Sequence, residues 1–216
     1  MNIVNNQLLS NTNLLHQLNK NFFNKTLSTS SIFFGSKGIG KYTFSINLIK
    51  SIYSSLISKD AINHHLNLLY NNTHPNVKFL QKLYDPKSNK IKNFINIEQI
   101  RNLDSVLYQS SLNNLPKFIV IDSADDLNKS SSNALLKILE EPKKNTYFIL
   151  ISHHVSSLLP TIRSRCIKFH ISKPTFDEFN QIINLQIKNV STDEINFLYY
   201  ISNASPGIAI NIYTDN

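Results

Sequence analysis

The chain has 216 residues, a formal net charge of +8 and a sequence pI of about 9.5, and 41% of its residues are hydrophobic. This composition excludes a disordered chain, and the longest apolar runs, such as residues 118–121, are too short to cross a bilayer. The single cysteine, Cys166, excludes an internal disulfide and a zinc site made only of cysteines. The first ten residues have no basic start and no long apolar stretch, so no signal peptide is predicted, and we expect a cytoplasmic protein without a membrane anchor.

The positive charge has two explanations that the sequence leaves open. It suits a nucleic-acid partner or an acidic protein surface. Asn, Lys and Ile are also over-used throughout, as drift in an AT-rich genome would produce, and no single stretch concentrates the charge.

The first half of the chain predicts one strand between two helices. Residues 1–30 indicate a polar helix and a loop, and residues 32–34 a short buried strand. Apolar residues then recur at helical spacing over 44–56. Residues 59–96 are predicted to be irregular, because Pro75 and Pro86 break the chain.

The second half predicts further strands that alternate with helices. Asn96 is placed to cap a helix that runs to about Tyr108, with Ile97, Ile100, Leu103 and Leu107 inward. The other predicted elements are a central parallel strand at 118–121, a helix at 134–140, a strand at 147–151 and a shorter strand at 167–171. Such alternation is typical of an α/β fold whose parallel sheet is covered by helices on both faces.

The pattern changes after Pro174. Thr175 with Glu178, and Ser191 with Glu194, have the spacing of capping boxes, and two or three helices follow. We therefore predict an α/β domain over residues 1–171 and a small helical domain over residues 172–216.

The stretch "GSKGIGKYT", from Gly35, follows the first predicted strand and precedes a helix. Gly35, Gly40 and Lys41 fit the pattern G-x-x-x-x-G-K-[ST] of a phosphate-binding loop, in which backbone N–H groups turn toward phosphate and the lysine reaches the β- and γ-phosphates. We assign Gly38 to the same cradle. The alternative is a glycine turn with a solvated lysine.

Two positions depart from what ATP hydrolysis needs. Tyr42 stands where a magnesium-binding hydroxyl is expected, and Thr43 comes one place late and should point away from the ion. Asp122 ends a buried strand, where a carboxylate would hold magnesium, or it caps the following turn. Ser123 follows it where a hydrolysing relative has a water-activating glutamate, and a neutral hydroxyl is a poor base.

Two arginines, Arg163 and Arg165, lie in "TIRSRC" just before the last strand. Arginine binds phosphate in bidentate fashion, and the alternative is an ordinary surface salt bridge. Glu140 and Glu141 near a predicted helix C-terminus oppose the helix dipole, which indicates a cationic partner, with Lys137 the nearest candidate.

The segments "NALLKILEEPKKNTYFIL" and "LLPTIRSRC" resemble the clamp-loader branch of the AAA+ ATPases. Within it, the chain is similar to the delta-prime family of bacterial DNA polymerase III subunits over about residues 32–207. "GSKGIGK", "HPNV" and "ISHH" resemble the versions of that family without a cysteine zinc module. The resemblance implies an AAA+ phosphate-loop domain followed by a small helical lid domain, and a third helical collar domain that would begin where this chain stops, at Asn216.

The resemblance also implies a role. Members of this family are generally non-hydrolysing parts of a five-subunit loader that places a sliding clamp on primed DNA. The Ser-Arg-Cys motif places Ser164 beside Arg165 on a loop at the domain edge, from which the Arg165 guanidinium would act on ATP bound by a neighbouring subunit. Ser152 or His153 takes the sensor position, and Gly207 or Ile208 stands where hydrolysing relatives have a third arginine.

We expect a non-hydrolysing clamp-loader subunit, and the main alternative is an ATP-hydrolysing, motor-type subunit. A third possibility is a free-standing nucleotide- or DNA-binding module. The implied partners are the motor (gamma/tau) and delta subunits, and indirectly the clamp and primed DNA. No cofactor is required, ATP or ADP binding is expected to be weak, and no metal site is predicted, because the adjacent pairs His64-His65 and His153-His154 lack ligand partners at metal spacing.

Overall fold

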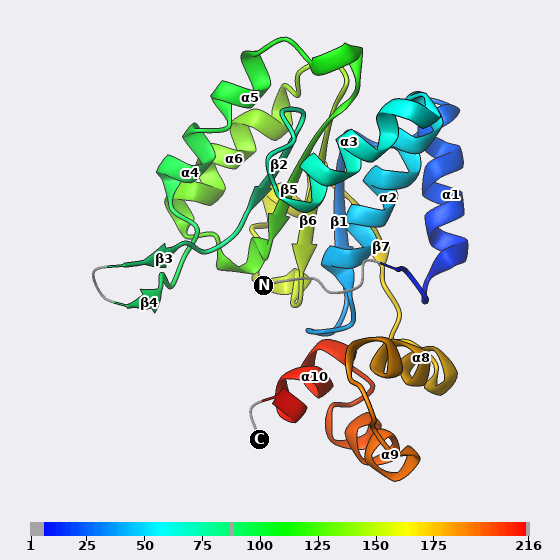
Figure 1. Ribbon diagram of the computed structural model, residues 1–216. Coiled ribbons are helices and arrows are strands. Elements are labelled where there is room, and N and C mark those ends of the chain that lie inside the picture. The colour runs from blue at the N-terminus through cyan, green and yellow to red at the C-terminus, as the bar shows by residue number, and fades with distance from the viewer. Residues whose placement is uncertain (1–6, 87–88, 215–216) are drawn as a thin grey trace.

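The computed structural model describes residues 7–86 and 89–214. Its centre is a parallel five-stranded sheet with the order β2-β5-β6-β1-β7 (Figure 1). In that order the strands are β2 (Val77–Leu80), β5 (Lys117–Asp122), β6 (Thr146–Ser152), β1 (Ser30–Phe34) and β7 (Ile167–His170). The three inner strands are almost wholly buried, as continuous apolar runs require.

Helices cover both faces of the sheet, so the predicted α/β fold with a covered parallel sheet is confirmed. One face packs against α1 (Thr12–Phe23), α2 (Lys41–Leu56) and α3 (Lys59–Tyr70). The other packs against α4 (Ile97–Arg101), α5 (Asp104–Tyr108), α6 (Lys129–Glu140) and α7 (Pro160–Arg165). Alternate residues of one strand serve the two cores: Phe118 and Val120 face the first, Ile119 and Ile121 the second. Three short 3₁₀ turns complete this part: η1 (Leu112–Asn114), η2 (Ala124–Asp126) and η3 (Val155–Ser157).

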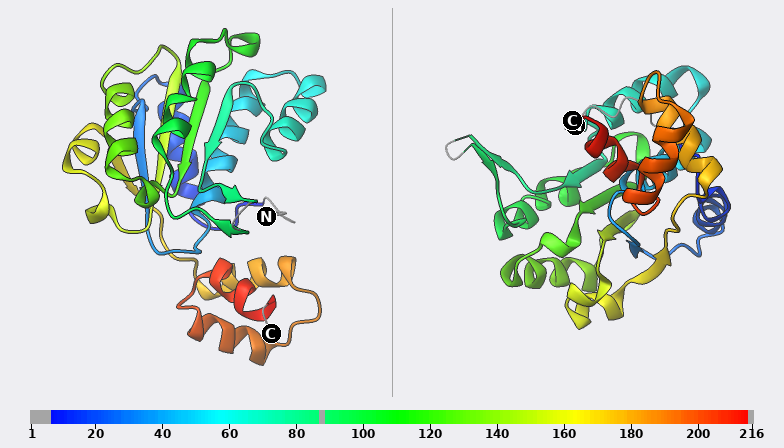
Figure 2. Two further views of the ribbon diagram at one scale, coloured as in Figure 1. Left: turned by 90° about the vertical axis from the view of Figure 1, so that its left-hand side faces the viewer. Right: turned by 90° about the horizontal axis from the view of Figure 1, so that it is seen from below.

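The prediction of irregular chain at residues 59–96 is wrong. This stretch holds α3, the edge strand β2, and a small hairpin of β3 (Tyr84–Asp85) and β4 (Lys90–Ile91) that projects from the body (Figure 2). Pro75 lies between α3 and β2 and breaks neither element. The stripe of α3 was hidden because a buried histidine, His65, occupies one of its inward positions.

The predicted helix at 96–108 is present as two short helices, α4 and α5. Asn96 and Gln99 form a reciprocal capping box at its start, as the cap position requires. Ile100, Leu103 and Leu107 are buried as predicted, whereas Ile97 is only half-buried.

The C-terminal segment folds into α8 (Phe176–Gln186), α9 (Thr192–Ile201) and α10 (Pro206–Thr214), which lie below the carboxyl edge of the sheet (Figure 1). Both predicted capping boxes are present. These helices share a hydrophobic cluster of their own, which includes Phe179, Ile183 and Leu198. The boundary at residues 171/172 remains a prediction, and the ends of the two predicted domains, residues 1–6 and 215–216, lie outside the described residues.

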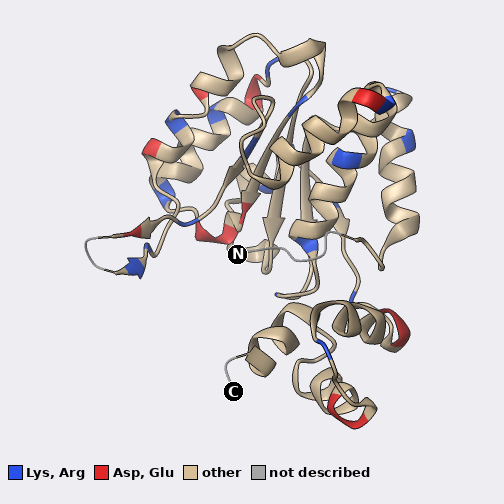
Figure 3. Cartoon of the chain, viewed as in Figure 1, with Lys and Arg blue, Asp and Glu red and all other residues tan. Residues whose placement is uncertain are grey.

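Asn11 joins the start of the chain to the connection between the two parts. Its amide nitrogen donates to the carbonyl of Ser172 (3.0 Å), and its amide oxygen accepts from the Ser172 backbone N–H (2.9 Å). Within the described residues, no helix is long and apolar enough to cross a membrane. In the view of Figure 3, lysines and arginines are spread over the α/β part rather than gathered in one stripe.

A buried pair of histidines connects α3 to the start of β2. His65 Nδ1 and His74 Nε2 are 3.0 Å apart, and each residue is only 3% exposed. His74 Nδ1 accepts from the backbone N–H of Asn76 (3.1 Å). His74 therefore carries its proton on Nε2 and donates it to His65. Burial is the main cause that lowers the pKa of both histidines. The charge of His64 adds to it for His65, and the charges of His65 and His64 add to it for His74.

The chain should lose stability as the pH falls below about 6.5, because the folded state keeps both imidazoles neutral while the unfolded chain protonates them. The free energy of unfolding should drop by up to about 1.4 kcal/mol per pH unit for each histidine. Urea unfolding between pH 7 and pH 5 measures this slope. His74→Gln should flatten it, the exposed His154→Gln should not, and a wild-type midpoint independent of pH would contradict the account.

Candidate functional site

The glycine loop lies between β1 and α2, in the strand-loop-helix context that its pattern requires. Gly38 has φ +81° and Gly40 has φ +94°, a left-handed conformation that side chains rarely adopt. Gly40 is the N-cap of α2, and Lys41 begins the helix. The predicted cradle residues Gly35, Gly38, Gly40 and Lys41 therefore lie together at the carboxyl edge of the sheet.

The Lys41 side chain is folded back onto the loop. It is 3% exposed, and its Nζ donates to the carbonyls of Gly35 (2.7 Å) and Ser36 (2.6 Å). Burial lowers its pKa to about 8, and the charges of Asp122 and Asp125 oppose that shift. A phosphate group would have to compete with two backbone carbonyls for this ammonium.

The position that should bind magnesium holds a tyrosine turned to other partners. The Tyr42 ring packs against Phe79 with centroids 5.4 Å apart, and its hydroxyl donates to Asn72 Oδ1 (3.4 Å). Burial, and then the charge of Asp122, raises the Tyr42 pKa to about 12, so the phenol stays protonated at neutral pH. A neutral phenol is a poor magnesium ligand. Thr43, half-buried on the first turn of α2, accepts a hydrogen bond at its backbone carbonyl from Asn47.

Asp122 is the last residue of β5 and belongs electrostatically to the same site. Burial raises its pKa, while the charge of Lys41 lowers it. Ser123, 6% exposed, donates from its Oγ to Asp125 Oδ2 (2.5 Å) and accepts from the Asp125 backbone N–H (3.2 Å). The hydroxyl at the position of the catalytic base is thus directed to a carboxylate. The residues present fit a phosphate group in part, but they do not fit magnesium-assisted hydrolysis.

Asp125 is a central residue that the sequence analysis missed. Besides Ser123, its carboxylate accepts from the hydroxyls of Ser152 (2.9 Å) and Ser157 (2.8 Å) and from the backbone N–H groups of His153 (2.6 Å) and His154 (3.1 Å). Burial favours the neutral acid, but these hydrogen bonds outweigh it and lower the pKa of Asp125 to about 2. The carboxylate ties the acidic turn after β5 to the end of β6, at the carboxyl edge of the sheet.

Both expected sensor residues, Ser152 and His153, are hydrogen-bonded to Asp125. The Ser152 hydroxyl is turned to Asp125, whereas His153 has a buried Nδ1 without a hydrogen-bond partner among the described residues. Burial, followed by the charge of Lys41, lowers the pKa of His153. The neighbouring pair Asp125-Asp126, three residues after the strand-end aspartate, was the one sequence signal for this network.

The small helical part touches the glycine loop directly. The Gly207 backbone N–H donates to the Gly38 carbonyl (2.8 Å), and a side chain at Gly38 would meet Ile208 at 3.0 Å. Gly207 and Ile208 are the positions at which the family resemblance implies an arginine in hydrolysing members. The start of α10 therefore packs backbone to backbone on the glycine loop, with no cationic side chain at positions 207 and 208.

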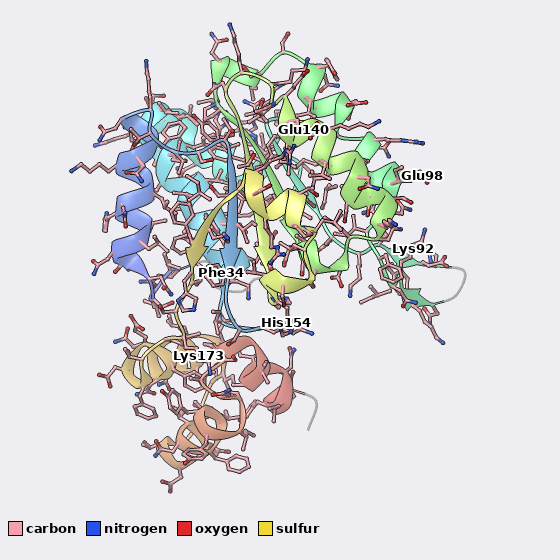
Figure 4. All side chains as sticks on the ribbon, turned by 180° about the vertical axis from the view of Figure 1, so that it is seen from behind. Phe34, Lys92, Glu98, Glu140, His154 and Lys173 are labelled. Carbon is pink, nitrogen blue, oxygen red and sulfur yellow. The ribbon has the colours of Figure 1, made fainter. Side chains whose placement is uncertain are left out.

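Arg165 lies at the opposite edge of the sheet. The strand register pairs Ser31 with Ile167, and β1 runs from Ser31 to Phe34 and into the glycine loop. Arg165 precedes Ile167, so it lies at the amino edge, more than about 10 Å of strand away from the loop. Figure 4 shows Glu140, the partner of Arg165, at this end and Phe34 and His154 at the other.

The expected loop position of Arg165 is wrong, because it is the last residue of α7. Its Nη2 donates to Glu140 Oε1 (2.6 Å) and its Nη1 to the Thr161 carbonyl (3.1 Å). Ser164 donates to the same carbonyl (3.0 Å). The suggested partner of Glu140, Lys137, is replaced by Arg165. Arg163 is half-buried and its Nε has no hydrogen-bond partner among the described residues.

Comparisons with known proteins agree with this architecture. Residues 10–175 match the family model described as "DNA polymerase III, delta subunit". The chain is 30% identical over 131 residues to DNA polymerase III subunit delta' of Buchnera aphidicola subsp. Baizongia pistaciae, which covers 61% of this chain and 38% of that protein. It is 32% identical over 142 residues to the Bacillus subtilis subunit of the same name, covering 65% and 41%. The matched region spans about two fifths of the length of these relatives.

Solved structures support the fold at lower sequence identity. A DNA polymerase III gamma subunit-related protein from Thermotoga maritima superposes with a TM-score of 0.59 at 20% identity, over 93% of this chain and 57% of that one. The RuvB Holliday junction branch migration motor of the same organism gives a TM-score of 0.53 at 16% identity, over 93% and 58%. The family match covers most of the chain. The two relatives named above, at 30% and 32% identity, are both delta-prime subunits. The chain therefore belongs to the DNA polymerase III delta-subunit family and is similar to its delta-prime members.

Proposed function

We propose that this chain is a non-hydrolysing clamp-loader subunit that supplies Arg165 to ATP bound by a neighbouring motor-type subunit. Its own nucleotide site takes no part in the chemistry. As a component of the DNA polymerase III holoenzyme, it would act in the cytoplasm with motor (gamma/tau) and delta subunits, and through them on the sliding clamp and primed DNA.

One observation carries this proposal: Arg165 and the glycine loop lie at opposite edges of one parallel sheet. A guanidinium at the amino edge is too far from the Lys41 site to act on a phosphate bound there. It is 37% exposed, so a second subunit can reach it. Because a planar guanidinium can neutralise charge that develops on a transferring phosphoryl group, an exposed arginine in this position suits action between subunits.

The site around Lys41 supports the other half of the proposal. Tyr42 replaces the magnesium-binding hydroxyl, Ser123 replaces the base, and Gly207 faces the loop in place of a cation. Together they remove the metal ligand, the base and the positive charge that phosphoryl transfer needs.

Nucleotide binding should be weak and nearly independent of magnesium. The loop N–H groups and Lys41 still offer donors to phosphate, but Lys41 must first give up its hydrogen bonds to two backbone carbonyls. Position 42 offers no serine or threonine hydroxyl to bind magnesium, because it holds a tyrosine whose hydroxyl is bound to Asn72. Titration calorimetry with ADP, with and without magnesium, measures both affinities. A gain of tenfold or more with magnesium would show that Thr43 has taken over as a ligand.

Copurification tests the proposed partners. The tagged chain, mixed with the motor and delta subunits of its organism, should retain both on an affinity column and form a complex that elutes early in gel filtration. If the chain binds neither subunit, the clamp-loader role fails. If the isolated chain hydrolyses ATP at the rate of a motor subunit, the alternative of a motor-type subunit is correct.

A further inference from the structure

Arg165 is held by contacts within its own chain. Its Nη1 donates to the carbonyl of Thr161, four residues earlier on α7, and its Nη2 to the carboxylate of Glu140. The guanidinium is therefore folded against the surface of its own subunit. To contact a phosphate on a neighbour, it has to give up one or both of these acceptors.

Glu140 is placed where a carboxylate needs a cation. It is the last residue of α6, where the helix dipole disfavours negative charge. Arg165 is the cation that the structure places against it, from a helix that packs beside α6. The pair thus balances an unfavourable charge on α6 and occupies the guanidinium at the same time.

The ion pair between Glu140 and Arg165 is weak enough for another anion to replace Glu140. Glu140 is 48% exposed and Arg165 37% exposed, and exposed ion pairs are weak because water screens them. A triphosphate offers more negative charge and more acceptor oxygens than one carboxylate, and arginine binds it in bidentate fashion. ATP bound by a neighbouring subunit should therefore bind Arg165 more strongly than Glu140 does, once the two subunits are in contact.

We propose that Glu140 parks Arg165: its carboxylate holds the guanidinium in a retracted position until a nucleotide triphosphate on the adjoining subunit displaces it. Glu140 is then a positioning residue that sets the ratio of resting to stimulated hydrolysis at that site. This inference rests on the proposed role of Arg165 between subunits.

The test uses Glu140→Gln, which keeps the shape of the side chain and removes its charge. In the complex reconstituted with motor and delta subunits, the resting rate at the site that receives Arg165 should rise about 1.5- to 5-fold, the range that the strength of an exposed ion pair converts to. The maximal rate with clamp and primed DNA should not change. The ATP concentration for half-maximal hydrolysis should fall by a similar factor, which a merely structural role would not produce.

Two further variants separate the possible outcomes. Glu141→Gln makes the same change in charge on the next residue, which lines a groove between α4, α5 and α6, and it should leave the ratio unaltered. In an Arg165→Ala background, Glu140→Gln should not change the ratio of resting to stimulated hydrolysis, because there is no guanidinium for Glu140 to hold. Each variant is first checked by thermal unfolding and by copurification.

Three results would overturn the inference. If Glu140→Gln lowers the stimulated rate as Arg165→Ala does, Glu140 orients Arg165 for catalysis rather than parking it. If it changes no rate while Arg165→Ala does, the pair has no regulatory role and the proposed function stands. If Arg165→Ala itself changes nothing, the proposed function is what fails.

Discussion

Arg165→Ala should lower clamp-stimulated ATP hydrolysis and clamp loading by the reconstituted complex. Arginine fingers contribute about 10³–10⁵ in rate, or roughly 4–7 kcal/mol of barrier at 1.36 kcal/mol per tenfold. Only the site next to this chain loses that contribution, so the total rate should fall partially. The variant should stay folded within about 1 kcal/mol, because the side chain is exposed and its ion pair is weak.

The comparison variant is Arg163→Ala, from the same helix. Arg163 is half-buried and two residues away, so its loss can affect folding but should not affect hydrolysis in complexes that assemble. Both variants are therefore compared only after thermal unfolding and gel filtration. A complex with Arg165→Ala that loads clamps at the normal rate, beside an impaired Arg163→Ala complex, would mean that the other arginine is the functional one.

The isolated chain should release no phosphate from ATP above background, and Ser123→Glu should not restore turnover. A missing base alone costs about 10²–10⁴ in rate. Tyr42 also replaces the magnesium-binding hydroxyl, and Gly207 or Ile208 stands in place of the third arginine expected in hydrolysing relatives. The new carboxylate would also stand beside Asp125, in place of a hydroxyl that donates to it. We therefore expect this variant to be less stable than the wild type and equally inactive.

Ser123→Ala is the matched control, because it removes the same hydrogen bond without adding a charge. Steady-state phosphate release and thermal unfolding of the three proteins measure activity and stability together. Turnover by Ser123→Glu at the level of a motor subunit would contradict our description of the site, since it would mean that the base was the one missing part.

The features predicted well from the sequence are those fixed by local physics. The apolar runs at 118–121 and 147–151 can only be buried, and the cap at Asn96 and the capping boxes at Thr175 and Ser191 depend on residues close together in the chain. The glycine loop was located for the same reason, because a strand, the loop pattern and a helical stripe follow one another directly.

The features that were missed depend on residues far apart in the chain. Asp125, in η2, meets Ser152 at the end of β6 and Ser157 in η3, and Glu140 meets Arg165 from another helix. The helix at 59–70 was missed because His65 appears polar in the sequence, although it is neutral and buried against His74 in the structure. Spacing along the chain carries no information on such pairs.

The most direct test of the central claim is ATP turnover by purified motor subunits as this chain is titrated into them. The account predicts no turnover by the chain alone, and a saturable rise in turnover per motor subunit when the wild-type chain is added. Arg165→Ala should bind with the same affinity and produce no rise. Turnover by the chain alone at the motor rate, or equal stimulation by Arg165→Ala, would contradict the claim that this subunit acts on its neighbour's ATP through Arg165.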